Sequence, residues 1–122
     1  MAVKPETVYL NEIRSLINNS LTGVKLIKLH GSQFMRLGNP DIIGTYMGIT
    51  FVIETKYVNG VLSEKQVYEL NEWKNAGAIV ITGRCGVDSP EDIVSTLVIR
   101  TRYALERMQL RLVDFRYHEA YK

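Results

Sequence analysis

The sequence contains very little of what a disulfide-stabilised or zinc-binding protein needs. Cys85 is the only cysteine, which excludes an internal disulfide and a cysteine-rich zinc site. The two histidines, His30 and His118, are too few to build a histidine-based metal cage. Any metal site in this chain should therefore be built from carboxylates.

Long apolar segments are also absent from the sequence. No apolar run is long enough to span a bilayer, and the opening residues Met1–Thr7 lack the apolar segment of a secretory signal. We therefore expect a cytoplasmic protein with no membrane partner. The 122 residues, of which 46% are hydrophobic, suit a single domain. We expect its core to span about residues 5–97.

A strong charge of one sign is the third feature that is missing. The net charge is only +2, so composition alone does not indicate a nucleic-acid-binding protein. The distribution of charge is more informative, because the segment from Val98 to Lys122 contains five arginines and that lysine but only three acids. Any basic surface should therefore involve the C-terminal segment.

Residues 38–56 carry the most informative pattern of the chain. Two apolar runs, Asp41–Tyr46 and Ile49–Lys56, are rich in β-branched and aromatic residues and predict two strands joined by a turn at Met47-Gly48. Side chains alternate between the faces of a strand, so Glu54 and Lys56 share one face. If the strands pair, Asp41 lies beside Glu54 and Lys56.

These residue types suit metal-assisted cleavage of a phosphodiester. Mg²⁺ prefers hard oxygen ligands, and it commonly binds one or two protein carboxylates together with water and phosphate oxygens. Bound metal can lower the pKa of a water molecule and neutralise charge on the phosphate. A lysine two residues along the strand from a metal-binding carboxylate can orient that water or hold a phosphate oxygen.

Pro40-Asp41 followed by Glu54-Thr55-Lys56 resembles the PD-(D/E)XK nuclease signature. The continuation resembles the VRR-NUC family more closely, and the resemblance spans about residues 6–97. The residues that carry this continuation are Gly60, Leu62, Ser63, Gln66 and the glycine that ends the next helix, Gly77.

The resemblance implies a role for each matching residue. Asp41 and Glu54 would bind the metal, with the carbonyl oxygen of Thr55 as a third ligand, Lys56 would be the catalytic lysine, and Gln66 would assist near the site. The family also places an acid on the first helix. Glu12 matches that acid best by its distance from Lys28 and Pro40, and Glu6 is the competitor.

The remaining segments predict helices around a mixed sheet. A helix should begin near Pro5 and end before Gly23, followed by a strand at Val24–His30. Ser63 and Gln66 form a capping box for a second helix, which precedes a strand at Ala78–Thr82. Ser89 and Pro90 begin a last helix. The expected class is α/β, in agreement with the restriction-endonuclease-like core that the resemblance implies.

Four residues are candidates for contact with the DNA backbone. Ser32 and Arg36 lie in the polar loop that leads to Pro40, and arginine and small polar side chains are common phosphate ligands. Lys28 precedes this loop, and Arg84 lies in the loop expected after the strand Ala78–Thr82. The alternative interpretation of residues 30–39 is an ordinary surface loop.

The last helix carries a pattern that is typical of a coiled coil. Val98, Leu105 and Leu112 are spaced by seven, and Thr101, Met108 and Phe115 follow each of them by three. We expect this seam to form a homodimer contact over about residues 90–120. The alternative is a helix that packs on its own sheet.

The leading hypothesis is a Mg²⁺- or Mn²⁺-dependent DNA endonuclease, similar to small phage-type members of the family. A dimer with two sites would suit a Holliday junction or other branched DNA. One alternative is a DNA-binding module without catalysis. Another treats the charged cluster as a structural ion pair in an unrelated α/β protein.

Overall fold

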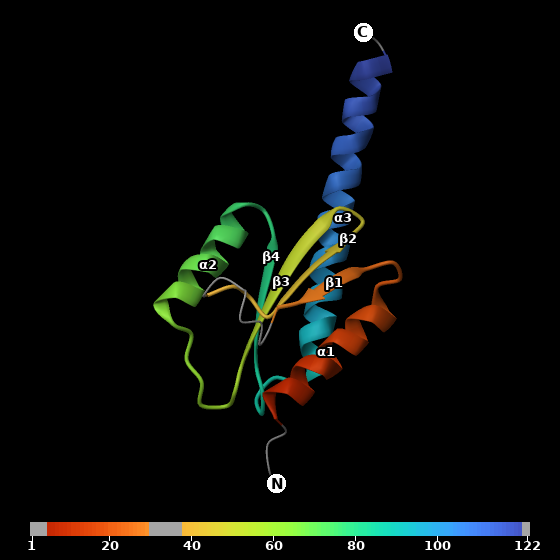
Figure 1. Ribbon diagram of the computed structural model, residues 1–122. Coiled ribbons are helices and arrows are strands. Elements are labelled where there is room, and N and C mark those ends of the chain that lie inside the picture. The colour runs from red at the N-terminus through yellow and green to blue at the C-terminus, as the bar shows by residue number, and fades with distance from the viewer. Residues whose placement is uncertain (1–4, 30–37, 121–122) are drawn as a thin grey trace.

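The computed structural model describes residues 5–29 and 38–120, and for Lys28 and residues 109–120 it describes the backbone alone. The order of helices and strands is the one that the sequence predicted (Figure 1). The elements are α1 (Glu6–Ser20), β1 (Lys25–Lys28), β2 (Ile42–Tyr46), β3 (Ile49–Lys56), α2 (Glu64–Asn75), β4 (Ile79–Arg84) and α3 (Pro90–Ala120).

The four strands form one mixed sheet in the order β1-β2-β3-β4. Strand β2 is antiparallel to both β1 and β3, and β4 runs parallel to β3. The turn between β2 and β3 has positive φ angles at Met47 (50°) and Gly48 (85°), the geometry that matches the twist of a tight hairpin. This turn pairs Ile42 with Ile53, so the residues that precede and follow them, Asp41 and Glu54, meet at one end of the hairpin.

One face of the sheet and two helices enclose the hydrophobic core. Ile42, Phe51, Ile53 and Ile81 contribute the sheet side of this core. The helical side comes from α1 and α3, which lie next to each other, whereas α2 lies on the other side of the sheet beside β4 (Figure 1). The buried residues of α1 are Tyr9, Leu10, Ile13 and Ile17, so this helix presents a face with a spacing of three to four residues.

Strand β4 continues two residues beyond its predicted end. Gly83 was interpreted as the start of a loop, but in the structure it lies within the strand. A Cβ at Gly83 would lie 2.8 Å from Ile93 Cδ1 and 2.9 Å from the Tyr9 hydroxyl, so the glycine lets both helices approach the sheet closely. The extension brings Arg84 into register with Lys56 of β3.

Helix α3 begins where the sequence predicted. The Ser89 hydroxyl oxygen accepts a hydrogen bond from the Asp92 N–H at 3.0 Å, which caps the helix. The first turns pack on the protein itself, because Thr101 is fully buried and Val98 packs against the core. The C-terminal part of the helix extends past the sheet (Figure 1).

The structure corrects the predicted dimer seam in its first half. Val98 and Thr101 face the protein's own core, and the exposed apolar side chains of this part of the helix are Ile99 (67%) and Tyr103 (64%). The side chains of Leu112 and Phe115 lie outside the described residues. Within residues 5–29 and 38–120, no helix is long and apolar enough to cross a membrane.

Candidate active site

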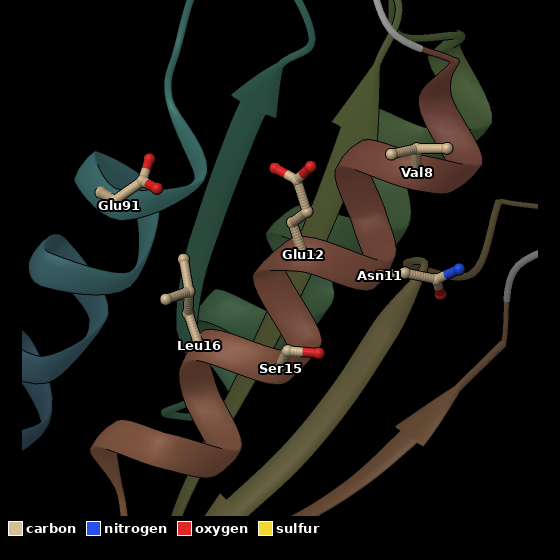
Figure 2. Close-up of a pocket in the computed structure, with 6 residues that line it drawn as sticks. All are labelled: Val8, Asn11, Glu12, Ser15, Leu16 and Glu91. Atoms are coloured by element: carbon tan, nitrogen blue, oxygen red, sulfur yellow. The ribbon is translucent and has the colours of Figure 1, made fainter.

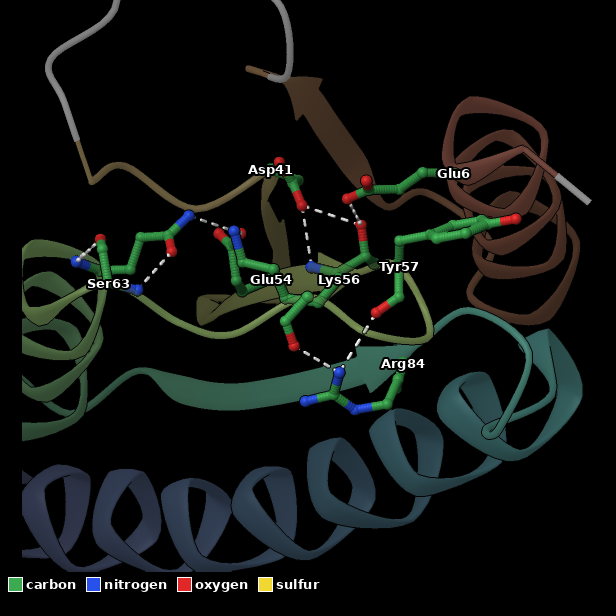
Figure 3. Close-up of polar contacts among 10 residues, drawn as sticks. Glu6, Asp41, Glu54, Lys56, Tyr57, Ser63 and Arg84 are labelled. Carbon is green, nitrogen blue, oxygen red and sulfur yellow. Dashed lines mark hydrogen bonds and ion pairs between the residues drawn. The ribbon is translucent and has the colours of Figure 1, made fainter. Parts of the chain in front are cut away.

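Asp41 immediately precedes β2 and is held by hydrogen bonds from the neighbouring strand β3. The backbone N–H of Thr55 donates to Asp41 Oδ2 at 2.8 Å, and the Thr55 hydroxyl donates to the same oxygen at 2.9 Å (Figure 3). On the other side, the Leu29 N–H donates to the Asp41 carbonyl oxygen at 2.7 Å. Asp41 is 7% exposed, so these contacts fix a nearly buried carboxylate in one orientation.

Glu54 projects from the middle strand beside Asp41, as the strand pairing predicted. It is 2% exposed, and its Oε1 accepts a hydrogen bond from Gln66 Nε2 at 3.2 Å. Lys56 Nζ lies 3.9 Å from the same oxygen, and the Lys56 side chain is 24% exposed. Among the described residues, nothing donates a hydrogen bond to the buried Oε2 of Glu54.

The environment of Glu54 opposes its negative charge. Burial, and after it the charge of Asp41, raises the pKa of Glu54 from 4.5 to about 8. Lys56 lowers this pKa, but it does not outweigh burial and the neighbouring acids, which include Glu6. The site therefore places two carboxylates together where a further cation, in addition to Lys56, is needed to stabilise both as anions.

Gln66 connects helix α2 to this carboxylate pair. Its backbone N–H donates to the Ser63 hydroxyl oxygen at 3.1 Å, and its Oε1 accepts from the Ser63 N–H at 2.9 Å, which completes the predicted capping box. Its Nε2 remains available and donates to Glu54. The Gln66 side chain thus caps α2 and also donates a hydrogen bond to Glu54. The capping function does not prevent Gln66 from acting near the site.

The structure places Glu6, not Glu12, beside the carboxylates. Glu6 Oε1 lies 3.4 Å from the Thr55 hydroxyl, the group that also donates to Asp41 (Figure 3). Glu6 precedes the buried Tyr9 and Leu10 by three and four residues, so it shares the inward face of α1.

Glu12 lies in a different part of the molecule. It lines a surface pocket of about 570 Å³ between α1 and the start of α3, with Glu91 on the other side (Figure 2). The other residues that line this pocket are Val8, Asn11, Ser15 and Leu16. The sequence favoured Glu12 because of its distance along the chain from Lys28 and Pro40. In the structure, the face of α1 that points toward the site carries Glu6 instead.

Of the four residues expected to contact DNA, the structure describes the side chain of Arg84 alone. Ser32 and Arg36 lie outside the described residues, and so does the side chain of Lys28, so these three assignments stay predictions. Arg84 Nη1 lies within hydrogen-bonding distance of three carbonyl oxygens, those of Tyr57, Val58 and Gly60. The Arg84 side chain therefore has a structural role in holding the turn after β3. The sequence did not indicate this role, because the contacts depend on the path of the chain after β3.

The donor set fits a hard divalent cation. Asp41 and Glu54 supply two carboxylates, and the buried, unpartnered Glu54 Oε2 is an available oxygen ligand. Among the residues that the structure describes, no three His, Cys, Asp or Glu side chains form a set that could hold a metal ion by themselves. Mg²⁺ needs only one or two protein carboxylates, because water, carbonyl and phosphate oxygens complete its octahedral shell.

A solved structure confirms the predicted fold class, a restriction-endonuclease-like α/β core. A VRR-NUC domain structure aligns with a TM-score of 0.58 and 22% identity, over 76% of this chain and 92% of that chain. A Holliday junction resolvase from the archaeon Archaeoglobus fulgidus aligns with a TM-score of 0.49 and 18% identity, over 67% of this chain and 70% of that chain. No family model and no curated protein matches the sequence. The likeness to the VRR-NUC domain is one of fold.

The two acids of α1 provide a matched test of the site. Glu6→Gln should weaken Mn²⁺ binding about 10–100-fold, the effect typical of a group that supports metal ligands. Glu12→Gln should leave the affinity unchanged, because Glu12 lies in the separate pocket of α1 and α3. Isothermal titration calorimetry measures both variants, and a larger loss for Glu12→Gln would contradict this placement.

The raised pKa of Glu54 predicts a pH dependence of stability in metal-free protein. Between pH 4.5 and about 8 the folded state binds more protons than the unfolded state, so the free energy of unfolding should fall as pH rises. The slope should approach about 1.4 kcal/mol per pH unit at most. Glu54→Gln should remove this component, and Glu72→Gln on the exposed side of α2 should retain it. Thermal unfolding in EDTA would contradict the assignment if wild type and Glu54→Gln lost stability equally.

Proposed function

We propose that this protein is a divalent-metal-dependent nuclease that hydrolyses phosphodiester bonds in DNA. The observation that supports this function best is the cluster of Asp41, Glu54 and Lys56 at one end of the β2–β3 hairpin. Two buried carboxylates can hold a divalent cation, and a partly exposed ammonium group can stabilise the charge that develops in this reaction. They project from a sheet whose fold is that of a VRR-NUC domain.

We assign the metal to Asp41, Glu54 and the carbonyl oxygen of Thr55, with Glu6 as a supporting acid. A bound Mg²⁺ or Mn²⁺ would supply charge neutralisation at the phosphate and a water molecule of lowered pKa. Thr55 fixes Asp41 through its N–H and hydroxyl, so the carboxylate needs little reorganisation. Gln66 holds Glu54 through Oε1, which leaves Oε2 for the metal.

Lys56 serves the phosphate and not the metal. Its ammonium lies 3.9 Å from Glu54 Oε1 and its side chain is partly exposed, so it can contact a DNA backbone that approaches this edge of the sheet. There it would hold a phosphate oxygen or orient the attacking water, and its positive charge would stabilise the charge that develops during hydrolysis. Gln66 assists by keeping Glu54 in place.

A cleavage assay tests this division of roles. Asp41→Ala and Glu54→Ala should abolish cleavage, and Lys56→Ala should slow it by about two to four powers of ten without weakening metal binding. The substrates are duplex, single-stranded, flap, fork and four-way-junction DNA, each with Mg²⁺, Mn²⁺ or EDTA. Binding without cutting in every metal would support a DNA-binding module instead. Loss of metal affinity in Lys56→Ala would contradict the separation of metal ligand from phosphate contact.

We further propose that the protein acts as a homodimer on branched DNA. Helix α3 extends past the sheet (Figure 1). Its side chains Ile99, Tyr103 and Met108 line a depression of about 700 Å³. A second copy would cover these apolar side chains, and two-fold pairing is the commonest arrangement for doing so. Two active sites in one dimer would match the two cuts that a four-way junction requires.

Changing Ile99 and Tyr103 together to Glu should convert the dimer to monomers, because each partner would then present charge to an apolar surface. Val87→Glu is the matched control, since Val87 is equally exposed (66%) but lies in the loop before α3. Light scattering at micromolar concentration reports the mass, and calorimetry should show unchanged metal affinity. A monomeric wild-type protein would refute both the dimer and the two-cut argument.

A further inference from the structure

We propose that Arg84 is a positioning residue that holds the turn after β3, so that Lys56 keeps its place beside Glu54. This inference rests on the proposed nuclease function and deepens it. It also replaces the prediction that Arg84 contacts DNA. Three sets of contacts support it: those of the guanidinium, those of the Arg84 backbone, and those between Gly60 and Lys56.

The Arg84 guanidinium binds three carbonyl groups of the turn at residues 57–60. Arg84 Nη1 lies 3.2 Å from the carbonyl oxygen of Tyr57 (Figure 3). It lies at the same distance from the carbonyl oxygen of Val58, and it also donates to the carbonyl oxygen of Gly60. The Gly60 N–H donates to the Tyr57 carbonyl oxygen at 2.8 Å and closes the turn. One cationic group thus donates to three carbonyl oxygens of the same turn, and it restrains residues 57–60 relative to the sheet.

The backbone of Arg84 is itself fixed on both sides. Arg84 is the register partner of Lys56, and the Cys85 N–H donates to the Lys56 carbonyl oxygen at 2.7 Å. On the outer side, the Arg84 N–H donates to Asp88 Oδ2 at 2.8 Å, and the Asp88 N–H returns a bond of 2.8 Å to the Arg84 carbonyl oxygen. The guanidinium therefore acts from a rigid part of β4.

Gly60 transmits this restraint to Lys56. A Cβ at Gly60 would lie only 3.3 Å from Lys56 Cβ and Cδ, so the glycine backbone lies close against the lysine stem. Lysine has a long and flexible stem, and an ordered ammonium needs support along it. Misplacement of a reacting group by about 1 Å can cost about a hundredfold in rate. Arg84 fixes Gly60, and Gly60 limits where the Lys56 stem can lie.

The test compares Arg84→Met with Arg100→Met. Arg100 is the matched control, because its Nη1 also donates to a carbonyl oxygen of β4, that of Val80 at 3.1 Å, but far from Lys56 along the strand. Arg84→Met should lower kcat about 10–100-fold. KM for DNA and the affinity for Mn²⁺ should stay unchanged, and Arg84→Lys should recover part of the loss. Arg100→Met should retain the wild-type kcat.

A double-mutant cycle with Lys56→Ala makes the test specific. If Arg84 acts through Lys56, then Arg84→Met should cause no further loss of kcat in the Lys56→Ala protein. Gly60→Ala, which presses on the lysine stem, should reproduce the loss of kcat even if Arg84→Met fails to fold. Equal losses in both backgrounds would overturn the proposal, as would a lower melting temperature with unchanged kcat.

The remaining outcomes separate this proposal from its rivals. A raised KM together with a weaker salt dependence of DNA binding would overturn it in favour of a direct phosphate contact by Arg84. If the wild-type protein cuts no DNA, the proposed function fails, and hydrogen exchange in metal-free protein then decides whether Arg84 holds the turn. The Gly60 amide should exchange at least tenfold faster in Arg84→Met than in Arg100→Met, and equal rates would overturn the restraint.

Discussion

The site depends on two carboxylates that the hairpin forces together. Asp41 and Glu54 are both nearly buried, and their mutual repulsion helps to raise the pKa of Glu54 to about 8. Hydrogen bonds and Lys56 offset the free-energy cost of this repulsion only in part. Thr55 donates twice to Asp41, and Gln66 and Lys56 support Oε1 of Glu54, while Oε2 has no hydrogen-bond partner within the described part of the chain. Because Lys56 does not outweigh burial and repulsion, such an arrangement is stable as a pair of anions only with a further cation between or beside the two carboxylates.

The β2–β3 hairpin brings the two carboxylates together, and the surrounding helices and strands support them. A shift of one residue in the β2–β3 register would move Glu54 and Lys56 to the opposite face, so the turn at Met47-Gly48 determines whether a site exists. Each further element then adds one support to the site. Helix α1 places Glu6 near Thr55, α2 supplies the amide of Gln66, and the extension of β4 aligns Arg84 with Lys56.

Local patterns in the sequence predicted most of this arrangement. The alternation of side chains brought Asp41 and Glu54 together correctly, and the capping box was correct because it depends on residues only three apart. The sequence was least informative about contacts between distant segments. Chain distance favoured Glu12 over Glu6, whereas helix phase decides between them. The bonds of Arg84 join positions more than twenty residues apart, and no local pattern indicates them.

Anomalous scattering from crystals soaked in Mn²⁺ tests the central claim most directly, because it locates the cation without requiring a substrate. We predict a peak at about 2.1 Å from carboxylate oxygens of Asp41 and Glu54, near the Thr55 carbonyl oxygen, and its loss in crystals of Glu54→Gln. A soaked wild-type crystal with no peak at this pair would contradict the account, and so would Mn²⁺ bound at Glu12 and Glu91 instead.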